Sequence, residues 1–209
     1  MHTPDGHAGE PAYARRVITD RAPRGAKTRA EFEASDGLAA FAPPPPPGPL
    51  QSATPALCAA VASGDATEVR RACKDVLAPR SDHLGVRPPT VRVLGARPRE
   101  VNEGVTTYQL YGDYAPDTQR VRVWLRTAVL GRVSSPRSFV STLLHEFCHH
   151  LDCAKLEWPG SFHTRGFYGR VDQLYHLALA TPDARRRPLH WVQMGGVWRV
   201  DWTRSRTAP

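Results

Sequence analysis

Residues 145–149, with the sequence His-Glu-Phe-Cys-His, combine two imidazoles and a carboxylate at a spacing that can bind and use a metal ion. In an α-helix, residues four positions apart lie on one face, one turn above the other, so His145 and His149 can bind one zinc ion together. Glu146 is rotated about 100° from His145 around the helix axis, at the edge of that face. A carboxylate there can accept a proton from zinc-bound water, which predicts Glu146 as the general base of a metallopeptidase.

A catalytic zinc usually has three protein ligands and keeps one position for water, so the pattern requires a third ligand. His163 is favoured because it follows the helix-breaking residues 158–160, after which the chain can fold back toward His145 and His149. We therefore expect one Zn²⁺ ion held by these three histidines, although other divalent metals bind the same groups. The alternatives that the sequence leaves open for the third ligand are His150, Glu157, His176 and His190.

Two further residues have candidate supporting roles. Asp152 comes three residues after His149 and can hydrogen-bond a ligand histidine, although an ordinary residue at a helix end is an equal alternative. A donor that stabilises the oxyanion formed when a peptide carbonyl is attacked can come from Tyr168, Arg165 or Tyr175, of which Tyr168 is preferred. For each of these three residues, packing or surface exposure remains the alternative.

The motif lies late in a well-specified helix. Ser135 is a good N-cap, Pro136 suits the first helical position, and one apolar stripe follows, formed by Val140, Leu144, Phe147 and Leu151. Residues 158–160 end this helix, and Ser161 can cap a second one that stops before Pro182. The helix can thus bury one face and present its histidines to a cleft.

Strands are expected on both sides of this helix. Residues 90–94, 106–114 and 120–126 have the composition or alternation of strands, and turn residues 113–118 predict that the second and third pair as a hairpin. A peptide substrate would lie beside Val121–Leu125. Gly195-Gly196 predicts a C-terminal hairpin, and helical periodicity from residue 51 predicts one or two helices that end before Pro79.

These motifs resemble the SprT-like zinc metallopeptidases. The resemblance is carried by residues 145–152, by residues 161–167, and by Phe167 four positions after His163, and it covers about residues 51–180. It implies a zincin-like α+β fold: a small mixed or antiparallel sheet packed on the HExxH helix and a following helix, here with a C-terminal hairpin. Thr164 stands where the family commonly has Gly, and no cysteine for a zinc ribbon follows Cys153. The resemblance therefore implies the core chemistry more than a substrate class.

Composition and charge indicate where the folded domain lies and which partners it can have. Residues 1–49 are rich in Pro, Gly, Ala and charge, with a Pro43–Pro47 run, so we expect a disordered tail, a metallopeptidase domain over 50–203 and a C-terminal tail over 204–209. The net charge of +8 leaves DNA as one candidate partner, with general solubility the favoured explanation. No secretory signal or membrane span is visible, and four cysteines without CxxC spacing indicate reduced thiols, so cytoplasm is expected.

Three hypotheses follow. The first is a zinc-dependent peptidase acting on polypeptides, with the roles given above. The second is a zinc-stabilised module that binds nucleic acid or protein without peptidase activity, against which the carboxylate of Glu146 argues because a structural site does not need it. The third is a protease whose targets are bound to DNA, which salt-sensitive DNA binding would distinguish from the first.

Overall fold

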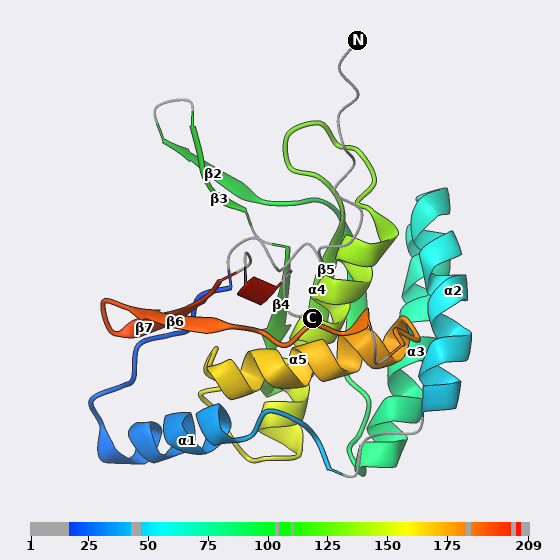
Figure 1. Ribbon diagram of the computed structural model, residues 1–209. Coiled ribbons are helices and arrows are strands. Elements are labelled where there is room, and N and C mark those ends of the chain that lie inside the picture. The colour runs from blue at the N-terminus through cyan, green and yellow to red at the C-terminus, as the bar shows by residue number, and fades with distance from the viewer. Residues whose placement is uncertain are drawn as a thin grey trace.

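The computed structural model describes residues 17–42, 47–102, 105–109, 111–182, 185–201 and 204–205. The helices are α1 (Ala26–Gly37), α2 (Pro47–Ser63), α3 (Ala66–Leu84), α4 (Pro136–Ala154) and α5 (Arg165–Ala178), with a 3₁₀ turn at Pro116–Thr118. The strands are β1 (Thr90–Ala96), β2 (Arg99–Asn102), β3 (Val105–Gln109), β4 (Gly112–Ala115), β5 (Arg120–Arg126), β6 (Trp191–Met194) and β7 (Val197–Val200). The fold is α+β, as the sequence predicts (Figure 1).

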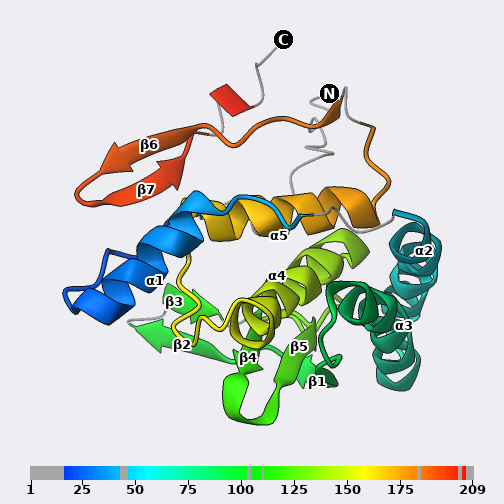
Figure 2. The same cartoon turned by 90° about the horizontal axis from the view of Figure 1, so that it is seen from below.

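Four layers make up the part of the fold that positions the motif. Figure 2 shows α4 between the β1–β5–β4 sheet and α5, with the β6–β7 hairpin beyond α5. Helix α4 begins as expected, because Ser135 Oγ accepts from the backbone N–H of Ser138 at 3.2 Å and Pro136 occupies the first turn. Its predicted apolar stripe is fully buried. The buried stripe fixes the rotation of α4 and so decides where its histidines point.

Strand β5 lies at the centre of the three-stranded sheet. It pairs in parallel with β1 and antiparallel with β4, and its Val121, Val123 and Leu125 are buried in the core. The predicted hairpin between residues 106–114 and 120–126 is therefore confirmed only for the part of the first segment that forms β4, which pairs with β5. The expected single strand over 106–114 is wrong, since β3 pairs instead with β2 in a separate antiparallel ribbon. Strands β2 and β3 pair with each other along the chain, and alternation within one segment does not reveal which partner a strand takes.

The expectation that the helices after residue 51 end before Pro79 is also wrong. Helix α3 starts at the cap Asp65, whose side chain accepts from two backbone N–H groups, and continues through Pro79 to the left-handed Gly85. Val76, Leu77 and Leu84 on either side of the proline are buried. Burial of this face outweighs the hydrogen bond that Pro79 removes.

The predicted disordered tail is corrected for residues 17–42. This segment contains α1, buries Val17 and Phe41, and packs against α5 (Figure 2). Its hydrogen bonds from Asp20, Glu31 and Asp36 reach residues about 130–140 positions away, so apolar periodicity within the segment gives no sign of them. Residues 1–16 and 43–46 lie outside the described residues, and Pro47, the last proline of the run, begins α2.

The C-terminal hairpin is confirmed, with Gly195 and Gly196 both in the left-handed conformation that its turn needs. Ile18 forms a bridge to Arg199, so the N-terminal segment adds to the edge of this hairpin. Ser205 is buried and donates to Asp201 O at 2.9 Å, so the start of the predicted C-terminal tail over 204–209 packs on the domain at this residue. In the described residues, no helix is both long enough and apolar enough to cross a bilayer.

Candidate metal centre

Three imidazoles converge where α4 meets the loop before α5. His145 Nε2 lies 3.0 Å from His163 Nε2 and 3.3 Å from His149 Nε2. One nitrogen from each ring falls within 4.8 Å of the others, which forms the only group of three or more potential metal ligands among the described residues. The structure thus brings together all three histidines that the sequence nominated.

The geometry and charge state of these rings fit a zinc ion. Three nitrogens bound tetrahedrally at 2.0–2.1 Å from zinc would be roughly 3.3 Å apart, close to the spacings found here. Burial, together with the charge of His163, lowers the pKa of His145 to about 3, and burial also lowers the pKa of His149 well below its usual range. Both rings are therefore neutral near pH 7, which is the form that binds a metal.

The hydrogen bond to His149 also suits metal binding. Its Nδ1 lies 2.7 Å from Ser161 Oγ, and that hydroxyl donates to Asp152 Oδ2 at 3.1 Å. The hydroxyl proton is directed at the carboxylate, so the Ser161 oxygen accepts from His149 Nδ1–H. This leaves the Nε2 lone pair of His149 free to face the other two histidines.

Two expectations about this loop are corrected. Ser161 does not cap the second helix, because α5 begins at Arg165 and its cap is Thr164, whose hydroxyl accepts from Phe167 N–H at 3.0 Å. His163 therefore belongs to the loop and not to the helix. Asp152 has no direct hydrogen bond to a ligand histidine and reaches His149 through Ser161.

Asp152 is instead one half of a buried ion pair. Its oxygens lie 2.9 and 3.0 Å from Arg170 Nη2, and both side chains are fully buried. Burial raises the pKa of Asp152 to about 6, against the opposing effects of Arg170 and Ser161. The carboxylate is thus ionised at neutral pH, and it anchors the Ser161 hydroxyl that contacts His149.

Glu146 is buried between α4 and β4. Burial raises the pKa of its carboxyl to about 8, and the nearby charge of Asp113 acts in the same direction. A Cβ atom added at Gly112 would lie 2.8 Å from Glu146 Oε1, so only glycine leaves room for this side chain on β4. A cation at the three imidazoles would favour the ionised carboxylate and so lower this pKa.

Phe167 and Tyr168 form the apolar wall of the site. The Phe167 ring is fully buried, and its centroid lies 4.5–5.1 Å from those of all three imidazoles. The Tyr168 ring stacks on His163, and its hydroxyl donates to Ile18 O at 3.2 Å. The oxyanion role of Tyr168 stays a prediction, with its hydroxyl engaged by the N-terminal segment.

The alternative third ligands have other places in the structure. His150 is fully buried, with Nε2 2.9 Å from Arg87 O and Nδ1 3.1 Å from the Tyr114 hydroxyl. His176 Nε2 lies 3.3 Å from Asp172 Oδ1, and both residues are on α5. The four residues His150, Glu157, His176 and His190 are all absent from the histidine group.

Sequence reasoning missed several residues that contact the site. Asp20, Glu31 and Asp36 come from the segment expected to be disordered. The first two bind the loop that carries His163, and Asp36 binds the first residue of α5. Gly112 was missed as well. A signal existed at Gly166 and Gly169, whose spacing of three on a helix indicates close approach of another chain segment.

Comparisons with known proteins provide no assignment. No family model matches this chain, and neither a curated protein nor a solved structure matches it. The functional inference therefore depends on the site itself: three converging imidazoles next to a buried glutamate.

Proposed function

We propose that the protein is a zinc-dependent metallopeptidase, with His145, His149 and His163 as the metal ligands and Glu146 as the general base. The observation that carries the proposal is that three imidazoles converge on one point while a buried carboxyl follows directly after the first of them. A structural zinc site has no use for a buried glutamate, and burying one without a function is costly.

Each residue has a defined task in this proposal. Zinc, when bound to three histidines, lowers the pKa of a coordinated water to near 7 and polarises the carbonyl of the substrate. Glu146 would accept a proton from the attacking water at a carboxylate oxygen and then donate it to the leaving amine. Ser161 and Asp152 hold His149 in the tautomer that offers Nε2.

We place the peptide substrate along β4 and not beside β5. Both edges of β5 are occupied, by β1 and β4, so no backbone groups of Val121–Leu125 are available for a peptide. Among the described strands, β4 is an edge of the sheet, and its Gly112 contacts Glu146. An extended peptide added to this edge would pass beside the proposed base.

The arrangement is compatible with a zincin-like, SprT-like protein, and we extend the proposal to that family. The supporting features are the HExxH helix packed on a small mixed sheet, and a third histidine just before the next helix. All four cysteines are free thiols, as expected, which fits the reducing cytoplasm that we propose as the location.

The test compares Glu146→Gln with Glu157→Gln, which changes an exposed acidic residue outside the histidine group. We expect wild type and both variants to bind one zinc ion. Hydrolysis of unfolded casein should fall about 10²- to 10⁴-fold in Glu146→Gln only, because the variant lacks the proton acceptor. Wild-type protein that binds zinc but hydrolyses neither casein nor other unfolded proteins would instead favour a zinc-stabilised binding module.

A further inference from the structure

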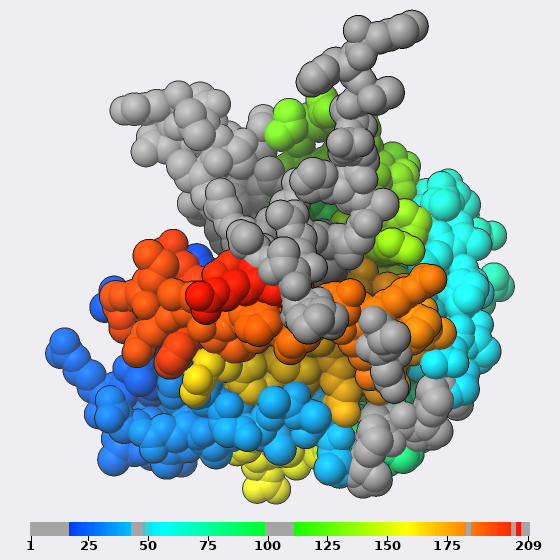
Figure 3. Space-filling model, in the orientation of Figure 1, coloured from blue at the N-terminus to red at the C-terminus, as the bar shows by residue number. Residues whose placement is uncertain are grey.

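The inference concerns residues 17–42, which we call the N-terminal strap, and it rests on the proposed metal site. The strap lies against α5 and the loop before it (Figure 1). In Figure 3, the blue strap and the orange hairpin lie on either side of the yellow and gold surface of this loop and α5. The loop before α5 therefore lies between segments from both ends of the described chain.

Carboxylates of the strap bind the backbone of the loop that carries His163. Glu31 Oε1 accepts from Gly160 N–H at 2.7 Å and from Ser161 N–H at 3.1 Å. Further along the chain, Asp20 accepts from His163 N–H, and Asp36 accepts from the N–H of Arg165, the first residue of α5, each at 2.9 Å. Three acidic side chains thus hold four backbone N–H groups within six consecutive residues. Such contacts fix the path of a loop that has little regular structure of its own.

Asp20 binds His163 in three ways. Its Oδ2 accepts from the His163 backbone N–H, its own N–H donates to His163 O at 2.8 Å, and the same Oδ2 lies 3.5 Å from His163 Nδ1. Because Nε2 of His163 faces the other histidines, Nδ1 is the nitrogen left to donate to a carboxylate. A carboxylate on the distal nitrogen fixes the tautomer and orientation of a ligand imidazole.

The strap residues next to Asp20 are themselves held in place. Thr19 N–H donates to Trp198 O at 2.9 Å, and Trp198 N–H donates to Thr19 Oγ1 at 2.8 Å. Ile18 O accepts from the Tyr168 hydroxyl, and Val17 is buried. Asp20 is thus presented to His163 from a segment held at the edge of the C-terminal hairpin by these contacts.

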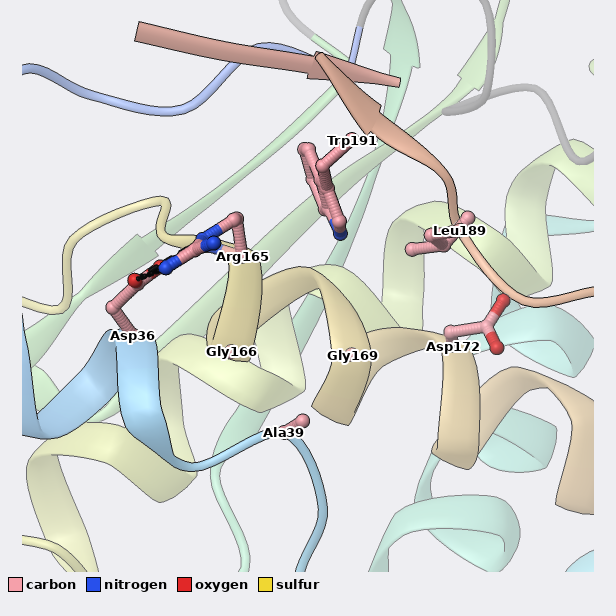
Figure 4. Close-up of a pocket in the computed structure, with 8 residues that line it drawn as sticks. All are labelled: Asp36, Ala39, Arg165, Gly166, Gly169, Asp172, Leu189 and Trp191. Carbon is pink, nitrogen blue, oxygen red and sulfur yellow. Dashed lines mark hydrogen bonds and ion pairs between the residues drawn. The ribbon is translucent and has the colours of Figure 1, made fainter. Parts of the chain in front are cut away.

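The far end of the strap packs on α5 where glycines leave room for its backbone. A Cβ atom at Gly166 would clash with Ser35 O and lie 2.7 Å from Leu38 O, and one at Gly169 would lie 2.7 Å from Ala39 O. Figure 4 shows both glycines on the face of α5 beside Ala39, with Arg165 paired to Asp36. The pocket in this view, about 520 Å³ in volume, lies between the strap, α5 and Trp191.

We infer that Asp20 is a positioning residue for His163, and that the N-terminal strap is part of the metal site. The strap supplies a partner for the imidazole and fixes the loop before the metal binds. Metal binding then costs less free energy, because the loop does not have to be ordered at that step. Metal affinity should therefore depend on a residue that is 143 positions away from its histidine in the chain.

The test measures the zinc dissociation constant of the full-length chain by competition with a chromogenic chelator. Asp20→Asn keeps an oxygen that can accept from His163 N–H but removes the charge that faces Nδ1. We expect its affinity to fall about 10- to 100-fold. Glu33→Gln, which removes one negative charge from an exposed position on α1, should bind zinc like wild type.

Two further measurements separate positioning from folding. Thermal unfolding of the metal-free proteins should give Asp20→Asn and Glu33→Gln similar midpoints, and the visible spectrum of bound Co²⁺ should change only in Asp20→Asn. Asp20→Glu, which keeps a carboxylate, should recover part of the lost affinity.

Zinc affinity of Asp20→Asn within twofold of wild type would overturn the inference and leave the proposed function intact. Wild-type protein that binds no zinc would overturn both. If affinity depends on Asp20 while Glu146→Gln hydrolyses casein like wild type, only the proposed role of Glu146 fails.

Discussion

The Nε2 atoms of His145 and His163 lie 3.0 Å apart, although eighteen positions separate the two residues in the chain. His145 Nε2 is also 3.3 Å from His149 Nε2. One proton on a neutral imidazole can bridge only one of these pairs, and the other lone pairs then face each other. A cation bound by all three nitrogens removes this repulsion, which is why the arrangement favours a metal site.

The contact between Gly112 and Glu146 leads to a prediction about activity. Gly112→Ala would place a Cβ atom 2.8 Å from both Cγ and Oε1 of Glu146 and 2.7 Å from Thr142 Cγ2. Because the added atom displaces the carboxylate and leaves the histidines in place, we expect normal zinc binding. Casein hydrolysis should fall on the order of 100-fold, as expected for a misplacement of about 1 Å.

Gly95→Ala is the matched control, since Gly95 is also in the sheet and an added Cβ there meets nothing within 4 Å. It should hydrolyse casein like wild type. Equal activity of the two variants would show that the position of Glu146 against β4 has no role in catalysis.

Close packing of the strap on α5 leads to a prediction about stability. Gly166→Ala introduces a Cβ atom into the carbonyl groups of residues 35–38, so the strap must move. We expect urea unfolding to show that the free energy of unfolding falls by about 1–3 kcal/mol, which is the usual cost of overpacking. Trypsin should then cleave faster at Arg24, Lys27 or Arg29 in the strap.

Gly37→Ala provides the comparison, because Gly37 is in α1 and has nothing within 4 Å of an added Cβ. Alanine favours the helical state over glycine by up to about 1 kcal/mol, so this variant should be as stable as wild type or more so. Resistance of Gly166→Ala to trypsin equal to that of Gly37→Ala would contradict the described packing.

The sequence predicts the parts of the structure that local rules control. The start of α4 follows from Ser135 and Pro136, the orientation of its histidines from the buried apolar stripe, and the C-terminal turn from Gly195-Gly196. The third histidine could be nominated from the helix break before it. Each of these signals lies within a few residues of the feature that it determines.

Contacts between distant segments could not be read in the same way. Asp20 and Glu31 bind a loop about 130–140 positions away through a few hydrogen bonds each, and such bonds leave no periodicity in the sequence. The pairing of β3 with β2 likewise depends on tertiary contacts, because an alternating sequence is compatible with pairing to β2 or to β5. Pro79 shows that burial of a helix face can override a local breaking signal.

The proposed metal centre is tested most directly by zinc binding to wild type, His163→Ala and His83→Ala, all purified without chelators. His83 is an exposed histidine at the end of α3, outside the histidine group, so its removal controls for nonspecific binding. We expect one zinc ion per chain in wild type and His83→Ala. The affinity of His163→Ala should be at least about 100-fold weaker, because losing a ligand should cost more than losing its supporting hydrogen bond. Wild-type protein that cannot be loaded with zinc, or His163→Ala that binds it as tightly as His83→Ala, would contradict the proposed metal centre.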